Sequence, residues 1–324
     1  MSRIFVHGVG AVSPAGWGMA GLREVLGGER SLQPMGITRP DGRSLPSFRV
    51  PAMEKRPAWA THPRMRRSSP ISQFALAAAL EALGCGETPA SFPGLAILVS
   101  VMGGSVQYSR RFFGEVLVDP STASPMLFPE TVFNAPASHL GAVLGTRARN
   151  DTHVADQSGF LACLATAANW LQQGIAESCL VVACEEADWT TAEAVRLFSK
   201  GTPASEGAAA LVLKREPSPV ELTAVSSPYP TLSRTDPKKD LDQVIRELQP
   251  EDRTAYFACG CRGTPPSLDL VVGEGLAALG GWTCVAAVDT LMRQSASSSI
   301  ALAAGANLQT LGARFQLHPK EVQE

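Results

Sequence analysis

The chain lacks a long uninterrupted apolar run and an excess of charge of either sign. No stretch of its 324 residues approaches the roughly 20 apolar residues that a membrane-spanning helix needs. Its 28 Lys and Arg against 30 Asp and Glu give a formal net charge of −2, so the basic footprint of nucleic-acid-binding and membrane-surface proteins is missing. We therefore expect neither a nucleic acid nor a membrane among its partners.

The chain also lacks a recognisable targeting segment and a complete set of metal ligands. The opening MSRIFVHGVGAV turns directly into a strand-like pattern, without the apolar segment of a signal peptide. The seven cysteines lie mostly in apolar surroundings, where free thiols act as small hydrophobic side chains. Cys259-Gly-Cys261 resembles half of a metal site, but no second ligand pair has matching spacing. We expect a cytoplasmic protein without a metal or other cofactor.

Short continuous apolar runs alternate with helical patterns along the first two-thirds of the chain. The runs predict buried strands at 4–12, 95–100, 179–184 and 208–214. The helical patterns cover 71–83 and 160–174, and a glycine marks the end of each. This alternation is typical of an α/β protein with largely buried sheets.

A segment rich in proline and serine, 216–237, interrupts this alternation. It predicts a connection or an edge segment, and it divides the chain into an amino-terminal half, 1–215, and a carboxyl-terminal half, 216–324. In the second half we expect helices at 241–249 and 268–281, strands at 253–260 and 282–288, and a closely packed small-residue helix within 295–306.

The turn Asp156-Gln157-Ser158 opens onto the helix predicted at 160–174. A helix N-terminus has unpaired N–H groups and a dipole that stabilise an anion, and many enzymes place a nucleophile there. Cysteine gains most from this position, because its thiolate is the reactive form. The turn holds no cysteine, so the sequence predicts an active-site turn whose chemistry has been lost.

Several segments, in order, resemble the β-ketoacyl synthase family of the thiolase fold. They are RIFVHGVGAVSPAG with LREVLGGERSL, SSPISQFALAAALEAL, FPETVFNAPASHLGAVLG, the DQSG turn with its helix, CLVVACEEAD and SEGAAALVLKRE. In the last third, only ACGCRGTPPSLD resembles a family landmark. The resemblance implies an α/β, thiolase-like layered αβαβα fold with a shortened carboxyl-terminal half.

Members of this family join acyl chains with a cysteine at the turn and two histidines that assist decarboxylation and stabilise the enolate. By the resemblance, Gln157 stands at the cysteine position, or Asp156 in a register slipped by one, and neither can carry an acyl group as a thiolate does. Cys259 stands at the first histidine position if one residue is inserted there. After His153 the only histidine is His318, so the resemblance implies that the pair of catalytic histidines is absent.

One branch of the family, the chain-length factors of type II polyketide systems, often carries glutamine at the cysteine position. Its members form a heterodimer with an active ketosynthase and shape the tunnel in which the chain grows. The resemblance implies this non-catalytic role here, in type II polyketide or fatty-acid-like biosynthesis, with an active ketosynthase and an acyl carrier protein as partners. The basic run at 64–67 is a candidate contact for the acidic carrier.

The stretch from 109 to 133 is rich in aromatic residues, and the resemblance implies that it faces the tunnel or the dimer contact. The candidate residues are Phe112, Phe113, Phe128 and Phe133. The alternative is that all four are ordinary core aromatics.

Two enzymatic interpretations compete with the non-catalytic one. Some family members with glutamine at the cysteine position are decarboxylases that make an acetyl starter from a malonyl carrier, but they need groups that stabilise an enolate. A different nucleophile is the other possibility, and its candidates are Cys163, Cys184 and Cys259. Cys163 lies within a helix and Cys184 ends a buried strand, so both are expected to be structural, and Cys259 has no histidine to activate it.

Overall fold

The computed structural model describes residues 2–86, 88–199, 201–230, 237–251, 253–261 and 267–318. The strands are β1 (Phe5–Ser13), β2 (Gly16–Trp17), β3 (Met35–Thr38), β4 (Ser44–Phe48), β5 (Leu95–Val101), β6 (Asn150–Val154), β7 (Ser178–Glu185), β8 (Ala204–Ser205), β9 (Gly207–Lys214), β10 (Val220–Val225), β11 (Tyr229–Pro230), β12 (Thr254–Cys259), β13 (Ser298–Ala304) and β14 (Gln309–Leu317). The helices are α1 (Met19–Leu26), α2 (Pro70–Ala82), α3 (Val106–Val118), α4 (Ala135–Val143), α5 (Gly159–Gln172), α6 (Trp189–Phe198), α7 (Pro237–Leu248), α8 (Asp269–Val272) and α9 (Ala277–Met292), with short 3-10 helices η1 (Ala58–Thr61) and η2 (Phe128–Glu130).

The large sheet repeats one pattern of strands twice. In the first half β1, β9, β7, β5 and β6 lie side by side, the first two pairings antiparallel and the last two parallel. In the second half β10, β14, β13 and β12 repeat the same order of directions. Antiparallel pairing of β1 with β10 joins the halves. Within the described residues the second half has no counterpart of β6.

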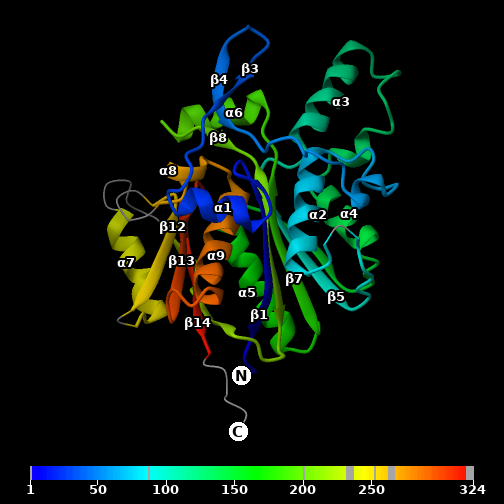
Figure 1. Cartoon of the computed structure of the whole chain (residues 1–324). Helices are drawn as coiled ribbons and strands as arrows, with labels where there is room; N and C mark the ends of the chain where they lie inside the picture. Colours follow the sequence, from blue (N-terminus) through cyan, green and yellow to red (C-terminus); the bar gives the residue numbers. More distant parts are fainter. Residues whose placement is uncertain are drawn as a thin grey trace.

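The helices complete five layers (Figure 1). The central helices α5 and α9 lie between the two halves of the sheet, where they share one hydrophobic core with both. Helix α2 packs with α4 on the outer face of the first half, and α7 covers the outer face of the second. The layered αβαβα fold expected from the sequence is thus confirmed. No helix in the described residues is long and apolar enough to cross a membrane.

Helix α9 is buried on every side, except at Thr290 and Met292. Its Trp282 is fully buried and donates its Nε1–H to the carbonyl oxygens of Val12 and Ala208, both at 3.0 Å. Gly280 lets the helix approach the start of α5, because an added Cβ there would lie 1.8 Å from a backbone oxygen. A helix that is apolar all round is typical of a protein interior.

Two predictions for the second half are wrong because fully buried helices and strands have the same apolar composition. The segment 282–288, expected as a strand, lies within α9. The segment 295–306, expected as a helix, contains the strand β13, which pairs with both β12 and β14. The Ser299 hydroxyl of this strand is satisfied inside the core, where it donates to the Ala287 carbonyl at 2.9 Å.

Two further segments also differ from prediction. The single helix expected at 268–281 is divided into α8 and α9, because Gly273, with φ of 82°, ends α8 in a left-handed conformation that favours glycine. The segment 216–237, expected as a connection or edge, contains β10, which lies inside the sheet between β14 and β1. The prolines flank this strand and leave its ladder positions free to pair.

Candidate functional site

The turn at the start of α5 is buried, and one carboxylate organises it. Asp156 is 0% exposed, and its Oδ1 accepts the N–H of Ser158 at 2.9 Å and the Ser158 hydroxyl at 2.7 Å. Its Oδ2 accepts the N–H of Asn307, at 2.6 Å, from the connection between β13 and β14. Gly305 makes this approach possible, since an added Cβ would lie 2.3 Å from either carboxylate oxygen. The turn is therefore fastened to the second half of the molecule.

Gln157, the residue at the predicted nucleophile position, has both ends of its carboxamide engaged. Its Nε2 donates to Glu274 Oε1 at 2.8 Å, and its Oε1 accepts the N–H of Ala306 at 3.2 Å. The side chain is only 4% exposed. A carboxamide is not a nucleophile, and this one is fixed by partners on both sides.

Glu274 is the site residue that the sequence analysis did not find. It lies between α8 and α9, is 5% exposed, and its Oε1 also accepts the N–H of Leu276 at 2.8 Å. Burial raises its pKa to about 7, although the hydrogen bonds from Leu276 and Gln157 oppose this. The available signal was a glutamate between two glycines, 273–275, inside an apolar run that otherwise reads as one helix.

Cys259, at the predicted first histidine position, ends β12 and is fully buried. Burial raises the pKa of its thiol well above the ordinary value. A hydrogen bond with Thr283 lowers this pKa, but the charges of Glu274 and Asp269 raise it further. The structure thus brings Cys259 near Glu274, but as a protonated thiol.

The other candidate nucleophiles share this property. Cys163 and Cys184 are fully buried, and burial raises the pKa of both thiols. A reactive cysteine needs the opposite environment, exposed and with a lowered pKa. Among the described residues, no group of three or more His, Cys, Asp and Glu side chains is placed to hold a metal ion.

The four candidate aromatic residues gather around α3, a helix that buries none of its side chains. Phe113, Phe128 and Phe133 are 59%, 57% and 44% exposed, so the alternative of ordinary core aromatics is wrong for these three. Phe112 is half-buried, and its ring lies 5.8 Å from that of Phe113 and 5.6 Å from that of Phe128.

More apolar side chains surround these rings. We call the set the α3 patch: Phe112, Phe113, Leu117, Val118, Met126, Phe128, Val132, Phe133 and, at the end of the edge strand β6, Val154. Leu117 and Val118 are 86% and 87% exposed. Figure 1 shows α3 projecting from the body of the molecule. Large exposed apolar side chains gathered in this number are typical of an interaction site.

No protein-family model and no curated protein sequence matches the chain. Solved structures match its fold. The ishigamide ketosynthase/chain length factor has a TM-score of 0.81 at 17% identity, and the match covers 98% of this chain and 100% of that chain. A ketosynthase in complex with its chain length factor from Xenorhabdus doucetiae gives 0.75 at 11%, covering 98% of each chain.

A third match is a type II polyketide synthase acyl-carrier protein in complex with its ketosynthase bound to the hexaketide. Its TM-score is 0.77 at 16% identity, with 98% of this chain and 99% of that chain covered. At such identities the likeness shows the fold. The chain therefore has the thiolase-like fold of ketosynthases and chain length factors, as its sequence motifs predict.

Proposed function

We propose that the chain is a non-catalytic, chain-length-factor-like partner of an active β-ketoacyl carrier-protein ketosynthase. In this role it forms a heterodimer with the ketosynthase and shapes the tunnel for the growing acyl or polyketide chain. The observation that carries the proposal is Gln157, a carboxamide at the nucleophile turn with both its polar ends hydrogen-bonded inside the protein.

The surroundings of Gln157 support the proposal. The residue bonded to it is a glutamate, and the thiol at the first histidine position is protonated and fully buried. Decarboxylative condensation needs a thiolate and donors aimed at the enolate oxygen. The described residues of this site supply no thiolate, and the side chains of Gln157 and Glu274 are hydrogen-bonded to each other.

The α3 patch is the surface that we propose meets the ketosynthase. Permanent hetero-complexes bury large areas, about 2,000 Å² or more, and these are more apolar than transient contacts. The patch is apolar and exposed, and the outer side of the edge strand β6 has no neighbour among the described strands. The acyl carrier protein is then a partner of the complex, as in the solved complex of a carrier with its ketosynthase.

A malonyl-carrier decarboxylase is the second candidate, and Glu274 is the observation that favours it. With a pKa of about 7, this carboxyl is partly protonated at neutral pH and so can donate a hydrogen bond beside Gln157. The assay is conversion of malonyl carrier to acetyl carrier by the chain alone. We expect none, because Gln157 and Glu274 satisfy each other and both are closed to solvent.

The experiment that tests the proposed function is co-expression of the chain with an active type II ketosynthase, followed by measurement of mass in solution. We expect a stable one-to-one complex, and self-association or poor solubility of the chain alone. Well-behaved monomers of both proteins at micromolar concentration, with no complex, would contradict the proposal.

A further inference from the structure

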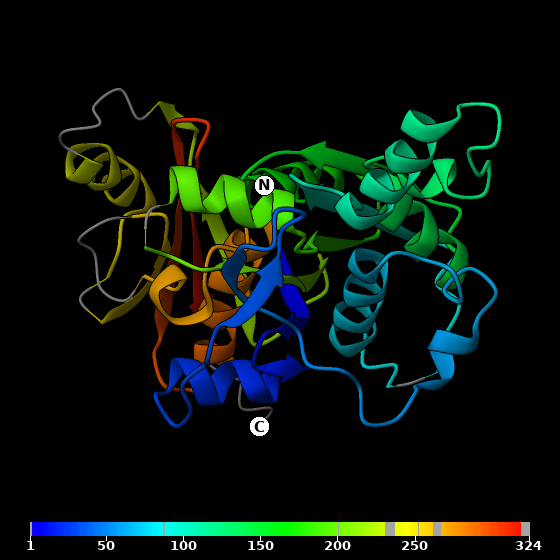
Figure 2. The same ribbon diagram turned by 90° about the horizontal axis from the view of Figure 1, so that it is seen from above.

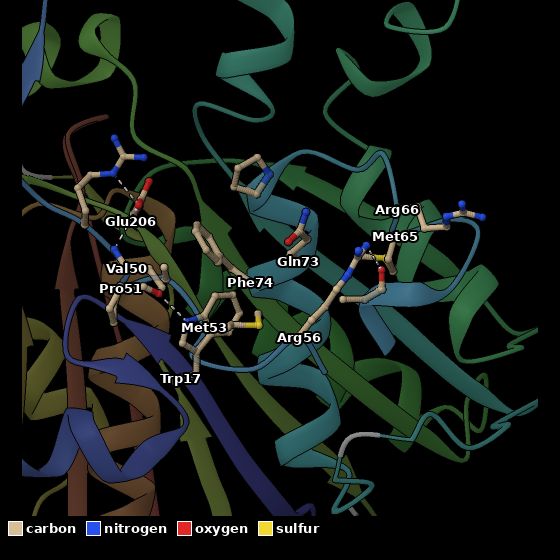
Figure 3. Close-up of a pocket in the computed structure, with 14 residues that line it drawn as sticks. Trp17, Val50, Pro51, Met53, Arg56, Met65, Arg66, Gln73, Phe74 and Glu206 are labelled. Atoms are coloured by element: carbon tan, nitrogen blue, oxygen red, sulfur yellow. Dashed lines mark hydrogen bonds and ion pairs between the residues drawn. The ribbon is translucent and has the colours of Figure 1, made fainter. Parts of the chain in front are cut away.

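The segment 49–67, which connects β4 to α2, arches away from the body of the molecule (Figure 2). It is anchored by Trp59 and Met65, which are 5% and 2% exposed. Between this segment and α2 lies a cavity of about 500 Å³ (Figure 3). Pockets of roughly 300–1,000 Å³ are typical of small-molecule sites.

One wall of the cavity is apolar and already formed. Trp17 and Phe74 lie against each other with ring centroids 5.5 Å apart, and Met53 lines the same wall. The indole Nε1 of Trp17 donates to the carbonyl of Pro51 at 2.8 Å, so the ring offers the cavity no unsatisfied polar group. This wall suits an aliphatic or aromatic part of a ligand.

The remaining lining carries positive charge in excess. Arg49 is neutralised by Glu206, 2.7 Å away and 2% exposed. No carboxylate lies within ion-pair distance of Arg56 or Arg66 in the part of the chain that the structure describes, and Arg56 donates from Nη2 to the carbonyl of Ala60 at 3.0 Å. Figure 3 shows both arginines on the side of the cavity away from Glu206.

Arg56 and Arg66 also line a second cavity, of about 680 Å³, together with Arg64 and Arg67. The one carboxylate that lines it, Glu130, is paired with His139 at 2.9 Å. In the lining of this second cavity four arginines therefore face one carboxylate, and positive charge is in excess.

We propose that the first cavity binds an amphipathic anion, whose carboxylate or phosphate pairs with Arg56 and Arg66 and whose apolar part lies against Trp17, Met53 and Phe74. The forked donors of arginine fit either oxyanion. The cavity lies on the α2 side of the sheet, whereas Gln157 lies on the α5 side, so this ligand is not the substrate of the turn. The anion is either a free small molecule or a group carried on the acyl carrier protein, and the second source rests on the proposed function.

The test uses the purified full chain and three probes with the same twelve-carbon chain, each below its micelle concentration: dodecyl phosphate, dodecanoate and the cation dodecyltrimethylammonium. Calorimetry measures binding, and tryptophan fluorescence, to which Trp17 contributes together with the other four tryptophans, gives a second readout. We expect saturable one-site binding of both anions and none of the cation. Equal binding of the cation, or no saturable binding of either anion, would overturn the proposal.

Variants of exposed arginines locate the anion. Arg56→Gln and Arg66→Gln should each raise the Kd of dodecyl phosphate about tenfold or more, because each removes one charge-assisted pair. Arg64→Gln, in the same segment but outside the first cavity, is the matched control and should leave the Kd unchanged. An unchanged Kd in both cavity variants, each with its melting temperature preserved, would contradict the site.

Competition between the bound probe and the acyl carrier protein distinguishes the two possible sources of the natural anion. If dodecanoyl carrier protein displaces the probe and the unloaded carrier does not, the natural anion is carried on the protein. If neither form displaces it, the ligand is a free small molecule. Binding of the unloaded carrier that needs Arg56 and Arg66, while no probe binds, would show a protein-docking surface in place of a ligand site and would refute the proposal. Neither result depends on a heterodimer with a ketosynthase.

Discussion

Gln157 Nε2 donates to Glu274 Oε1 across 2.8 Å, and the two residues are 117 positions apart in the chain. The bond links the turn before α5, in the first half, to the segment before α9, in the second. Gln157 stands at the position where the resemblance to ketosynthases puts a cysteine. The carboxyl beside it, that of Glu274, has a pKa of about 7. The proposed non-catalytic role depends on this pair.

The pair should stabilise the fold. Glu274→Ala leaves the buried amide N–H groups of Gln157 and Leu276 without their acceptor. Each buried donor without a partner costs about 1–3 kcal/mol, so with two of them we expect the free energy of unfolding in urea to fall by about 2–6 kcal/mol. In the Gln157→Ala background the same change should cost less, because one orphaned donor is gone. Equal losses of unfolding free energy in both backgrounds would show that Gln157 and Glu274 are not energetically coupled.

Stability should fall as the pH rises through neutrality. Burial raises the pKa of Glu185 to about 8, and those of Glu186 and Glu274 to about 7, from an ordinary value of 4.5. The folded protein therefore binds protons that the unfolded chain has released. The contribution of these raised pKa values to the free energy of unfolding is complete below about pH 4.5 and is lost as the pH rises through 7 to 8.

One substitution isolates Glu185, the carboxyl of these three whose pKa is raised furthest. Glu185→Gln removes an ionisation that costs the folded state at high pH, so the slope of unfolding free energy against pH should flatten between about pH 5 and 9. Glu193→Gln is the control, since Glu193 lies on the surface and its pKa is lowered, and it should keep the original slope. Urea titrations at each pH measure both. A steeper fall in the Glu185 variant would contradict the assignment.

The α3 patch should carry the ketosynthase contact. Phe113→Asp and Phe128→Asp place charge on an apolar surface without opening a cavity, because both side chains are more than half exposed. We expect complex formation to weaken by at least tenfold while the melting temperature of the chain changes little. Phe198→Asp on α6, 82% exposed and outside the patch, is the matched control. If it weakens the complex as much as the patch variants do, the contact lies elsewhere.

Restoring the thiol should not restore condensation. In Gln157→Cys the helix N-terminus favours a thiolate, whereas the nearby Asp156 and Glu274 carboxylates oppose it. We expect slow alkylation by iodoacetamide and no β-ketoacyl product from the chain alone. Losing one oxyanion donor typically costs about a hundred- to a thousandfold in rate, and groups that act together are not repaired singly. Detectable product would mean that working electrophilic groups are present.

The sequence predicted those features that depend on neighbouring residues. The turn at 156–158, the helix that follows it and the buried strands of the first half all have local patterns, and all are confirmed. Glu274 could not be predicted, because its partner lies far away in the chain and the sheet must form before they meet. The segment 282–288 was assigned to the wrong element, because an apolar run buried on all sides fits a strand or a helix equally well. The resemblance implied a tunnel or dimer contact for Phe113, but its local sequence did not distinguish an exposed aromatic side chain from one in the core.

The most direct test of the proposed non-catalytic role is to determine which subunit of the complex carries the acyl group. The reconstituted complex of the chain with an active ketosynthase is incubated with acyl carrier protein loaded with an acyl group, and each subunit is weighed by intact-protein mass spectrometry. The account predicts one acyl adduct on the ketosynthase and none on this chain, whose turn presents the bonded carboxamide of Gln157. An acyl adduct on this chain would contradict it.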